Sequence, residues 1–165
     1  MAILPVSVYP DSVLRQRSKF VTQFDIKLEN FINDLLETMR SQPGGIGIAA
    51  PQVGNLIRVV CVDVTPRQKA NGCLVFVNPV IKRSLGSRVG REGCMSVPEY
   101  TANVRRAERI MVEAQDRRGE LVKLESEGVE AVCIQHEIDH LDGILFLDRV
   151  DSLKTDIFRR KRFAR

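Results

Sequence analysis

The sequence lacks the patterns that mark several common classes of protein. It has no CxxC pair, and its four cysteines, at positions 61, 73, 94 and 133, are not spaced like a small disulfide framework. This usage predicts free thiols in a reducing compartment. No apolar run approaches the length of a membrane span, and the N-terminus lacks the charged start and apolar stretch of a signal peptide. We therefore expect a soluble cytoplasmic protein without a membrane partner.

Phosphate-binding motifs are also missing. The glycine-rich stretch 45–54 contains no lysine or arginine and matches neither GxxxxGKS/T nor GxGxxG, so nucleotide binding is not expected. Its glycines and alanines allow another backbone to come close, as when an edge strand binds an extended peptide. A plain glycine turn between core elements explains the stretch equally well when it is taken alone. Gln52 is the one polar side chain in this stretch that is long enough to contact a ligand.

What is present predicts an α+β fold. The 165 residues suit a single domain, 1–165, that can bury a core without disulfides. Asp25 can cap a long helix in the N-terminal half, whose apolar residues recur at helical spacing up to Met39. Runs of β-branched residues predict strands at 57–64, 73–77, 104–115 and 120–124, with the last two forming a hairpin. A C-terminal helix is expected from about Asp151 to the end of the chain.

Histidine is scarce, and its placement is informative. The only two histidines stand four residues apart in an H-E-x-x-H motif. They share a 3.6-residue stripe with Val129, Val132 and Cys133, which predicts a helix that can be capped by Ser126 and stopped at Gly143. On such a helix His136 and His140 lie on one face, so that both can reach one metal ion with Glu137 beside it. Two buried, hydrogen-bonded histidines without a metal are the alternative, and the motif favours the metal.

A catalytic site of this kind usually has three protein ligands and leaves one position for water. The common zinc peptidases take the third ligand from a downstream glutamate or histidine, but the sequence has neither after the motif. Cys133 would lie roughly 7 to 8 Å along the helix axis from the metal, too far for a bond of about 2.3 Å. Cys94, in an irregular loop, can be brought in from another element and is the preferred third ligand. Asp148 is conceivable, but no motif supports it.

Three separated stretches together resemble the signature motifs of bacterial peptide deformylases. Residues 45–52 match G-Φ-G-Φ-A-A-x-Q, residues 92–96 match E-G-C-Φ-S, and residues 136–140 match H-E-x-D-H, where Φ is an apolar residue. All polar positions are kept, the order is the same, and the resemblance covers nearly the whole chain. Met95 stands where leucine is commoner. The family fold is α+β, with antiparallel β-sheets surrounding the metal-bearing helix.

The resemblance implies a metal-dependent hydrolase that removes the N-formyl group from the N-terminal formylmethionine of nascent polypeptides and releases formate. It implies one divalent metal ion, usually Fe2+, where the Cys-His-His donor set alone suggests zinc. Zinc or nickel can replace iron in a purified sample, because Fe2+ beside a thiolate is vulnerable to oxidation. In the implied mechanism a metal-bound hydroxide attacks the formyl carbon, and Glu137 acts as general base and then general acid. The oxyanion that develops on the formyl oxygen is stabilised by the metal, the Gln52 amide and the Met95 N–H.

Further roles follow from the same resemblance. A peptide would pair with the backbone of Gly45 and Gly47, and Glu92 and Arg106 would form an ion pair that holds the cysteine loop. A merely structural salt bridge is the alternative for that pair. The methionine side chain would enter a pocket whose apolar residues could equally be ordinary core. That pocket is formed by Ile46, Val129, Val132, Cys133 and His136.

Basic residues are concentrated at the C-terminus, although the net charge of +4, from 25 basic and 21 acidic residues, does not indicate sequence-specific nucleic-acid binding. Arg159, Arg160, Lys161 and Arg162 could contact ribosomal RNA near the emerging chain, or simply form a solvated helix end. Two other functions remain open from the sequence. One is a metal-binding protein of the same fold that has lost catalysis, and the other is a zinc endopeptidase.

Overall fold

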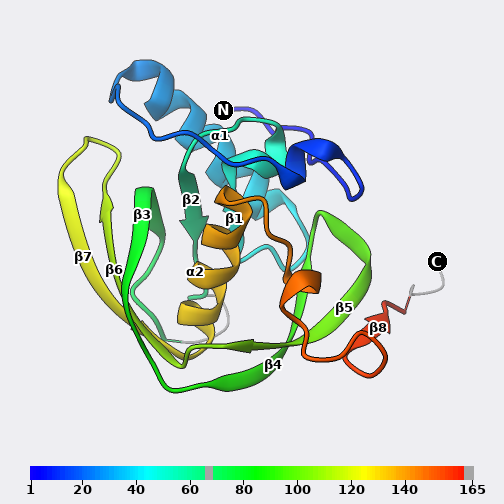
Figure 1. Ribbon diagram of the computed structural model, residues 1–165. Coiled ribbons are helices and arrows are strands. Elements are labelled where there is room, and N and C mark those ends of the chain that lie inside the picture. Colours follow the sequence, from blue (N-terminus) through cyan, green and yellow to red (C-terminus); the bar gives the residue numbers. More distant parts are fainter. Residues whose placement is uncertain (66–68, 162–165) are drawn as a thin grey trace.

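The computed structural model describes residues 1–65 and 69–161 (Figure 1). Within these ranges the chain forms two α-helices, α1 (Ile26–Ser41) and α2 (Gly128–Leu141), together with short 3-10 turns and eight strands. The strands are β1 (Gly47–Ala49), β2 (Val59–Val62), β3 (Leu74–Leu85), β4 (Arg88–Cys94), β5 (Val97–Arg106), β6 (Arg109–Gln115), β7 (Leu121–Glu127) and β8 (Ile157–Arg159).

All strand pairs are antiparallel, in one sheet of order β1-β2-β3-β6-β7 and another of order β4-β5-β8. Figure 1 shows α2 at the centre, with the sheets curving around it. The predicted α+β fold with antiparallel sheets around this helix is therefore confirmed. That residues 1–165 form one domain stays a prediction.

Helix α1 follows the predicted pattern closely. The carboxylate of Asp25 accepts a hydrogen bond from the Leu28 N–H at 3.0 Å, which satisfies one of the backbone donors that a helix start leaves free. The helix ends before Pro43, as the sequence indicates. Its apolar stripe is buried, with Ile32 and Leu35 fully inaccessible. These residues pack against one face of the larger sheet.

Strand β2 separates the two helices. Val59 and Cys61 belong to the apolar cluster beneath α1, whereas Val60 and Val62 belong to the cluster around α2. Successive side chains of a strand point to opposite faces, so a strand covered on both faces is apolar throughout. Both clusters pack against β2. This packing fixes the position of α2 relative to β1, the edge strand of this sheet.

Helix α2 begins one residue later than a Ser126 cap would place it, at Gly128. Ser126 lies in β7, and its hydroxyl donates to the Glu130 carboxylate at 2.7 Å instead of capping the helix. The chain enters the helix through Gly128, whose φ of +64° is a conformation that favours glycine. The predicted stop is confirmed. The helix ends at Leu141, and a Cβ on Gly143 would lie 2.5 Å from the backbone oxygen of Arg15.

The strand predicted at 73–77 extends further, because β3 runs from Leu74 to Leu85 without a break at Pro79 and with a register shift between Val77 and Val80. Such an irregularity accommodates a residue that cannot donate to the ladder. Of the two cysteines in these strand segments, Cys61 is buried and Cys73 is exposed. Positions 66–68, between the strands predicted at 57–64 and 73–77, lie outside the described residues.

The predicted C-terminal helix is wrong over the part of the segment that the structure describes. Residues 152–156 form turns, in which the Ser152 N–H donates to the Asp156 carboxylate at 2.9 Å, and the chain continues as β8. The pairing of β8 with β5 brings the apolar side chains of this segment into contact with the rest of the protein. Ile157 packs on an apolar cluster, and the ring of Phe158 lies 3.7 Å from the guanidinium carbon of Arg91. Positions 162–165 lie outside the described residues.

Candidate metal centre

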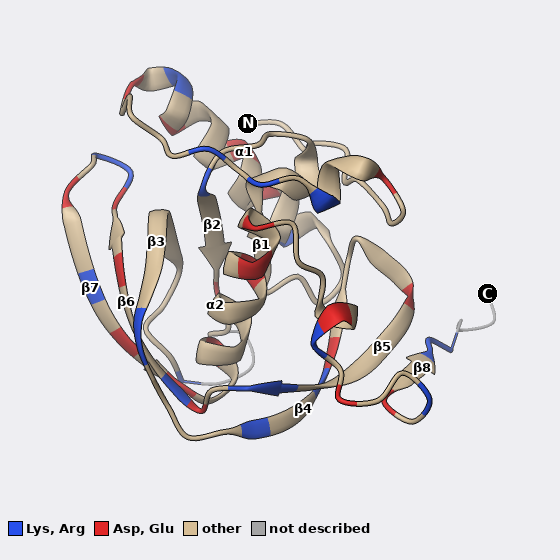
Figure 2. Ribbon diagram, viewed as in Figure 1, with Lys and Arg blue, Asp and Glu red and all other residues tan. Residues whose placement is uncertain are grey.

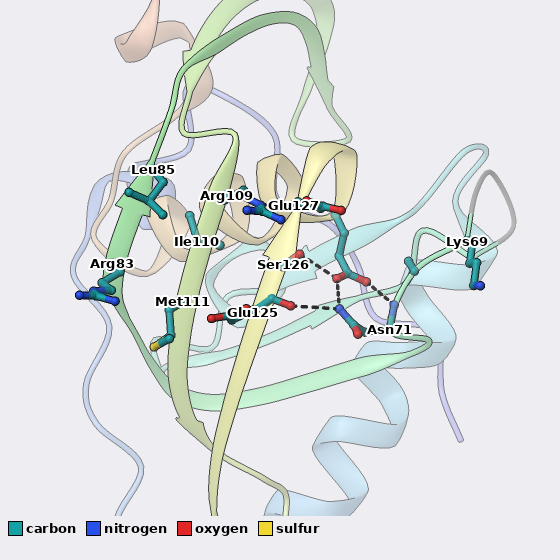
Figure 3. Close-up of a pocket in the computed structure, with 12 residues that line it drawn as sticks. Lys69, Asn71, Arg83, Leu85, Arg109, Ile110, Met111, Glu125, Ser126 and Glu127 are labelled. Carbon is teal, nitrogen blue, oxygen red and sulfur yellow. Dashed lines mark hydrogen bonds and ion pairs between the residues drawn. The ribbon is translucent and has the colours of Figure 1, made fainter.

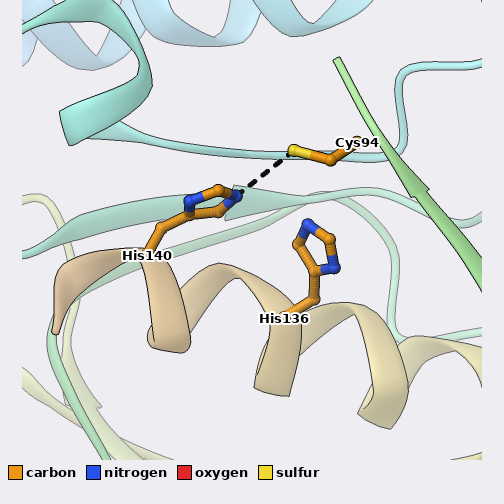
Figure 4. Close-up of side chains that lie close together, drawn as sticks. All are labelled: Cys94, His136 and His140. Atoms are coloured by element: carbon orange, nitrogen blue, oxygen red, sulfur yellow. Dashed lines mark hydrogen bonds between the residues drawn. The ribbon is translucent and has the colours of Figure 1, made fainter. Parts of the chain in front are cut away.

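Three side chains from two distant segments converge in the interior. Cys94 comes from the end of β4, and His136 and His140 come from α2 (Figure 4). Their potential ligand atoms all lie within 4.8 Å of one another, and all three residues are buried. The Cys94 sulfur is 3.4 Å from Nε2 of His140. Of the groups in the described residues that could hold a metal, this is the one the structure contains.

Local backbone geometry explains the convergence. The two histidines are one helical turn apart and therefore share a face of α2. Cys94 sits where the β4–β5 hairpin changes register, between the Glu92–Ala102 and Cys94–Val97 pairs. Because residues two apart in a strand share a face, Glu92 and Cys94 both point inward, and both are buried.

Glu92 orients His136. Its carboxylate lies 2.8 Å from Nδ1 of His136 and receives two hydrogen bonds from the Arg106 guanidinium, at 2.9 and 3.0 Å. Burial alone would raise the pKa of Glu92, but the hydrogen bonds from His136 and Arg106 outweigh it and hold that pKa at about 2. A carboxylate at Nδ1 leaves Nε2 as the ring nitrogen that can face a metal.

The network continues beyond this pair. Arg106 also donates to Asp139 at 2.6 Å, and Asp139 is held from its other side by Arg149 at 2.8 Å. Asp139 is the aspartate within the helix motif, so its position was visible in the sequence. Its partner Arg149 had no sequence signal.

His140 and Glu137 each carry a buried polar atom that has no hydrogen-bond partner among the described residues. These atoms are Nδ1 of His140 and Oε2 of Glu137. Burial lowers the pKa of His140 well below its usual value, so the ring is neutral, which is the form that binds metals. Burial likewise raises the pKa of Glu137 to about 7. The unpartnered Glu137 oxygen, beside a thiol and two imidazoles, suits a bound cation and its water, whereas Nδ1 of His140 is not the ring nitrogen that lies near Cys94.

Edge strand β1 approaches Glu137 closely. A Cβ added at Gly47 would lie 2.6 Å from Oε1 of Glu137 and 2.6 Å from the Cys133 sulfur, so a side chain cannot fit there. Gln52, just after β1, is 1 % exposed and turns its amide into the site. Its Oε1 accepts from the Ala49 N–H at 2.9 Å, and its Nε2 lies 3.0 Å from Ser96 Oγ and 3.5 Å from the Cys94 sulfur. The amide N–H group therefore faces the metal centre.

A cavity of about 500 Å³ opens beside these groups. The structure brings the sequence-predicted site residues to its wall, except for Arg106 and His140. Arg106 lies behind the wall, bonded to Glu92, and His140 lies deeper, beside Cys94. The predicted lining residues are Gly45, Ile46, Gly47, Gln52, Glu92, Cys94, Met95, Val129, Val132, Cys133, His136 and Glu137. Sequence reasoning did not assign to this site seven further lining residues, which are Gln42, Pro43, Gly44, Arg91, Gly93, Pro98 and Arg160.

A second pocket of about 440 Å³ lies beside β7 and the start of α2 (Figure 3). Its buried acid, Glu130, accepts hydrogen bonds from the Asn71 backbone at 2.9 Å and from the Ser126 hydroxyl. Arg109 is paired with Glu127 at 2.9 Å. The Glu130 contacts join α2 to a loop and to β7, and the Arg109–Glu127 pair joins β6 to β7, so we assign them a structural role.

Comparison with known proteins identifies the family. The family model for polypeptide deformylase matches residues 3–156. The chain belongs to the polypeptide deformylase family. The resemblance seen in the three sequence motifs is thereby confirmed, and the relatives compared below carry the name of an enzyme.

The similarity extends over nearly the full length. The peptide deformylase of Thermodesulfovibrio yellowstonii is 42% identical over 161 residues, which is 98% of this chain and 97% of the relative. The crystal structure of the Thermotoga maritima peptide deformylase superposes with a TM-score of 0.86 at 40% identity, covering 92% of this chain and 100% of that one. A Met-Ala-Ser-bound peptide deformylase structure from Acinetobacter baumannii gives 0.85 at 33% identity, covering 90% and 99%.

No helix within the described residues has the length and hydrophobicity needed to span a bilayer.

Proposed function

We propose that this protein is a metal-dependent hydrolase that removes the formyl group from the N-terminal formylmethionine of nascent polypeptides and releases formate. Deformylation of nascent chains is the activity of its family. The observation that carries the proposal is the buried Cys94, His136 and His140 group with the Glu137 carboxylate at its side. A cytoplasmic location belongs to the same proposal and is supported by the free thiols.

Cys94, His136 and His140 would hold one divalent cation, which when bound lowers the pKa of water and polarises a carbonyl oxygen. The donor set of one thiolate and two imidazoles suits zinc, and nickel is compatible with it. Fe2+ is the metal that the family resemblance favours. Metal analysis of protein purified without oxygen distinguishes these ions.

Glu137 would move the protons. A buried carboxyl with a pKa near 7 can both accept a proton from the attacking water and return it to the departing amine near neutral pH. The carboxylate lies against β1, where the scissile bond would be placed. The Gln52 amide faces the same point, and together with the Met95 backbone N–H it would stabilise the developing oxyanion.

Substrate binding would use the edge of the larger sheet. An extended peptide can pair with the backbone around Gly45 and Gly47, because β1 has no strand on its other side among the described residues. The methionine side chain would enter the cavity formed by Ile46, Val129, Val132 and Cys133. The Acinetobacter baumannii relative with bound Met-Ala-Ser supports a peptide of this length as ligand.

Glu92 and Arg106 would position the metal ligands. Replacing Arg106 by Leu leaves the Glu92 and Asp139 carboxylates buried without their shared partner, and His136 loses its fixed orientation. We expect the affinity for the metal to fall by about 10- to 100-fold, as is typical when such a supporting partner is lost. Titration of the metal-free variant with Zn2+ measures this. A variant with unchanged affinity would show that the pair is only structural.

One comparison separates the candidate functions. The protein should release formate from formyl-Met-Ala-Ser and leave the internal peptide bonds intact. A protein that binds metal but releases no formate would be an inactive member of the fold. Cleavage of an internal bond would instead indicate an endopeptidase.

A ribosome contact through the basic C-terminus is a separate proposal. Arg159, Arg160 and Lys161 are exposed on and after β8, and Figure 2 shows basic residues following that strand. The fourth basic residue, Arg162, lies outside the described residues. Changing the three described residues to Gln should weaken co-sedimentation with ribosomes, most clearly at low salt, because phosphate contacts are salt-dependent. Equal co-sedimentation of both proteins across salt concentrations would remove the proposal.

A further inference from the structure

Arg160 reaches the candidate active site from the far end of the chain. Its backbone N–H donates to the Glu99 carbonyl at 2.7 Å, extending the pairing of β8 with β5. This brings the guanidinium over Gly93, the residue before Cys94. A Cβ at Gly93 would lie only 2.5 Å from Nη2 of Arg160, so the guanidinium occupies space that the missing side chain leaves open. Arg160 consequently lines the same cavity as Cys94 and Glu137.

The charge of Arg160 has no ion-pair partner among the residues that the structure describes. The side chain makes no ion pair with any residue in the described ranges, and it is exposed. The carboxylates lining this cavity are Glu92, which is committed to Arg106 and His136, and Glu137. An unpaired cation at the mouth of a substrate cavity attracts carboxylates and repels other cations.

A second arginine adds to the positive charge beside the cavity. Arg91 also lines the cavity, and it is held in place by stacking on Phe158 and by a 3.1 Å hydrogen bond to Asn103. The part of the lining from Gln42 to Gly47 contains no charged side chain. The positive charge is therefore confined to the wall formed by β4 and β8.

The expected path of the peptide passes this wall. With the formyl group at Cys94 and the methionine side chain in the apolar part of the cavity, an extended chain advances about 3.3 Å per residue. The side chains of the next two residues thus emerge within reach of a long arginine beside Gly93. Successive side chains point to opposite sides, so one of these two positions faces the arginine wall.

We propose that Arg160 is a specificity-determining residue that favours formylated peptides with an acidic side chain at the second or third position. This inference rests on the proposed function and adds a preference to it. The contact is an exposed ion pair, so its expected effect is modest, about two- to fivefold in affinity, and it should shrink as salt is added.

The test compares C-terminally amidated peptides, so that the only carboxylate is on the side chain. Formyl-Met-Asp-Ala-amide and formyl-Met-Ala-Asp-amide are compared with their Asn counterparts in formate release, and the unformylated peptides are compared in calorimetric binding. We expect one Asp peptide to show a lower KM and tighter binding than its Asn counterpart, with kcat unchanged. Arg160→Gln should remove the difference between the Asp and Asn peptides, and Arg160→Lys should largely retain it.

Lys154→Gln is the matched control, because it removes the same charge from the exposed turn before β8, outside the cavity. It should keep the preference. Equal binding of Asp and Asn peptides by the unmodified protein, or a preference that survives Arg160→Gln, would overturn the inference. The proposed function fails separately, by absence of formate from every peptide, and in that case the binding comparison still decides the role of Arg160.

Discussion

Changing Glu137 to Gln should lower kcat for formate release by roughly two to four orders of magnitude, the range typical of a lost general acid–base group. The amide has nearly the same shape as the carboxyl and fits the same buried space next to Gly47. It cannot accept a proton from water, however, and it cannot protonate the departing amine. The metal ligands are left intact, so the variant should still bind one equivalent of metal.

The matched control is Glu130→Gln. Glu130 is a buried acid on the same helix, two turns earlier, and it bonds to Asn71 and Ser126 away from the metal centre. We expect this variant to lose some stability and to keep its kcat. If Glu137→Gln retained both its metal and the original rate, Glu137 would not be the proton carrier.

Changing Cys94 to Ala should remove stoichiometric metal binding and, with it, activity. Loss of a supporting partner costs about 10- to 100-fold in metal affinity, so loss of a direct ligand should cost more than about 100-fold. The fold should persist, because the strand pairs flanking Cys94 do not depend on its side chain. Metal content after dialysis and formate release at saturating substrate measure the two effects.

Cys73→Ala controls for the loss of a thiol, since Cys73 is exposed and remote from the cavity. It should bind metal as tightly as the unmodified protein. A Cys94→Ala protein that held one equivalent of metal after dialysis would contradict the assignment of Cys94 as a ligand.

The parts of the site that could be predicted from the sequence are those encoded by local spacing. His136 and His140 are four residues apart, so their common face, with Glu137 beside it, follows from helix geometry alone. Cys94 required a further argument, namely that no downstream glutamate or histidine was available. The fold class followed from the same periodicities, together with the resemblance of the three motifs.

The features that were predicted wrongly or missed depend on contacts between distant segments. The segment after Asp151 has too few apolar residues to specify its structure by itself, and pairing with β5 decides that it becomes a strand. Only that pairing brings Arg160 to Gly93. In the same way, Arg149 contacts Asp139 because the chain folds back toward α2 after that helix ends. No local sequence pattern predicts this contact.

The most direct test of the central claim is formate release from formyl-Met-Ala-Ser by protein of measured metal content, before chelation, after chelation and after metal is restored. We predict release that scales with metal content, disappears with the chelator and returns with Fe2+, with one free N-terminal amine formed per formate. Fully metal-loaded, folded protein that released no formate, or release that persisted in metal-free protein, would contradict the account.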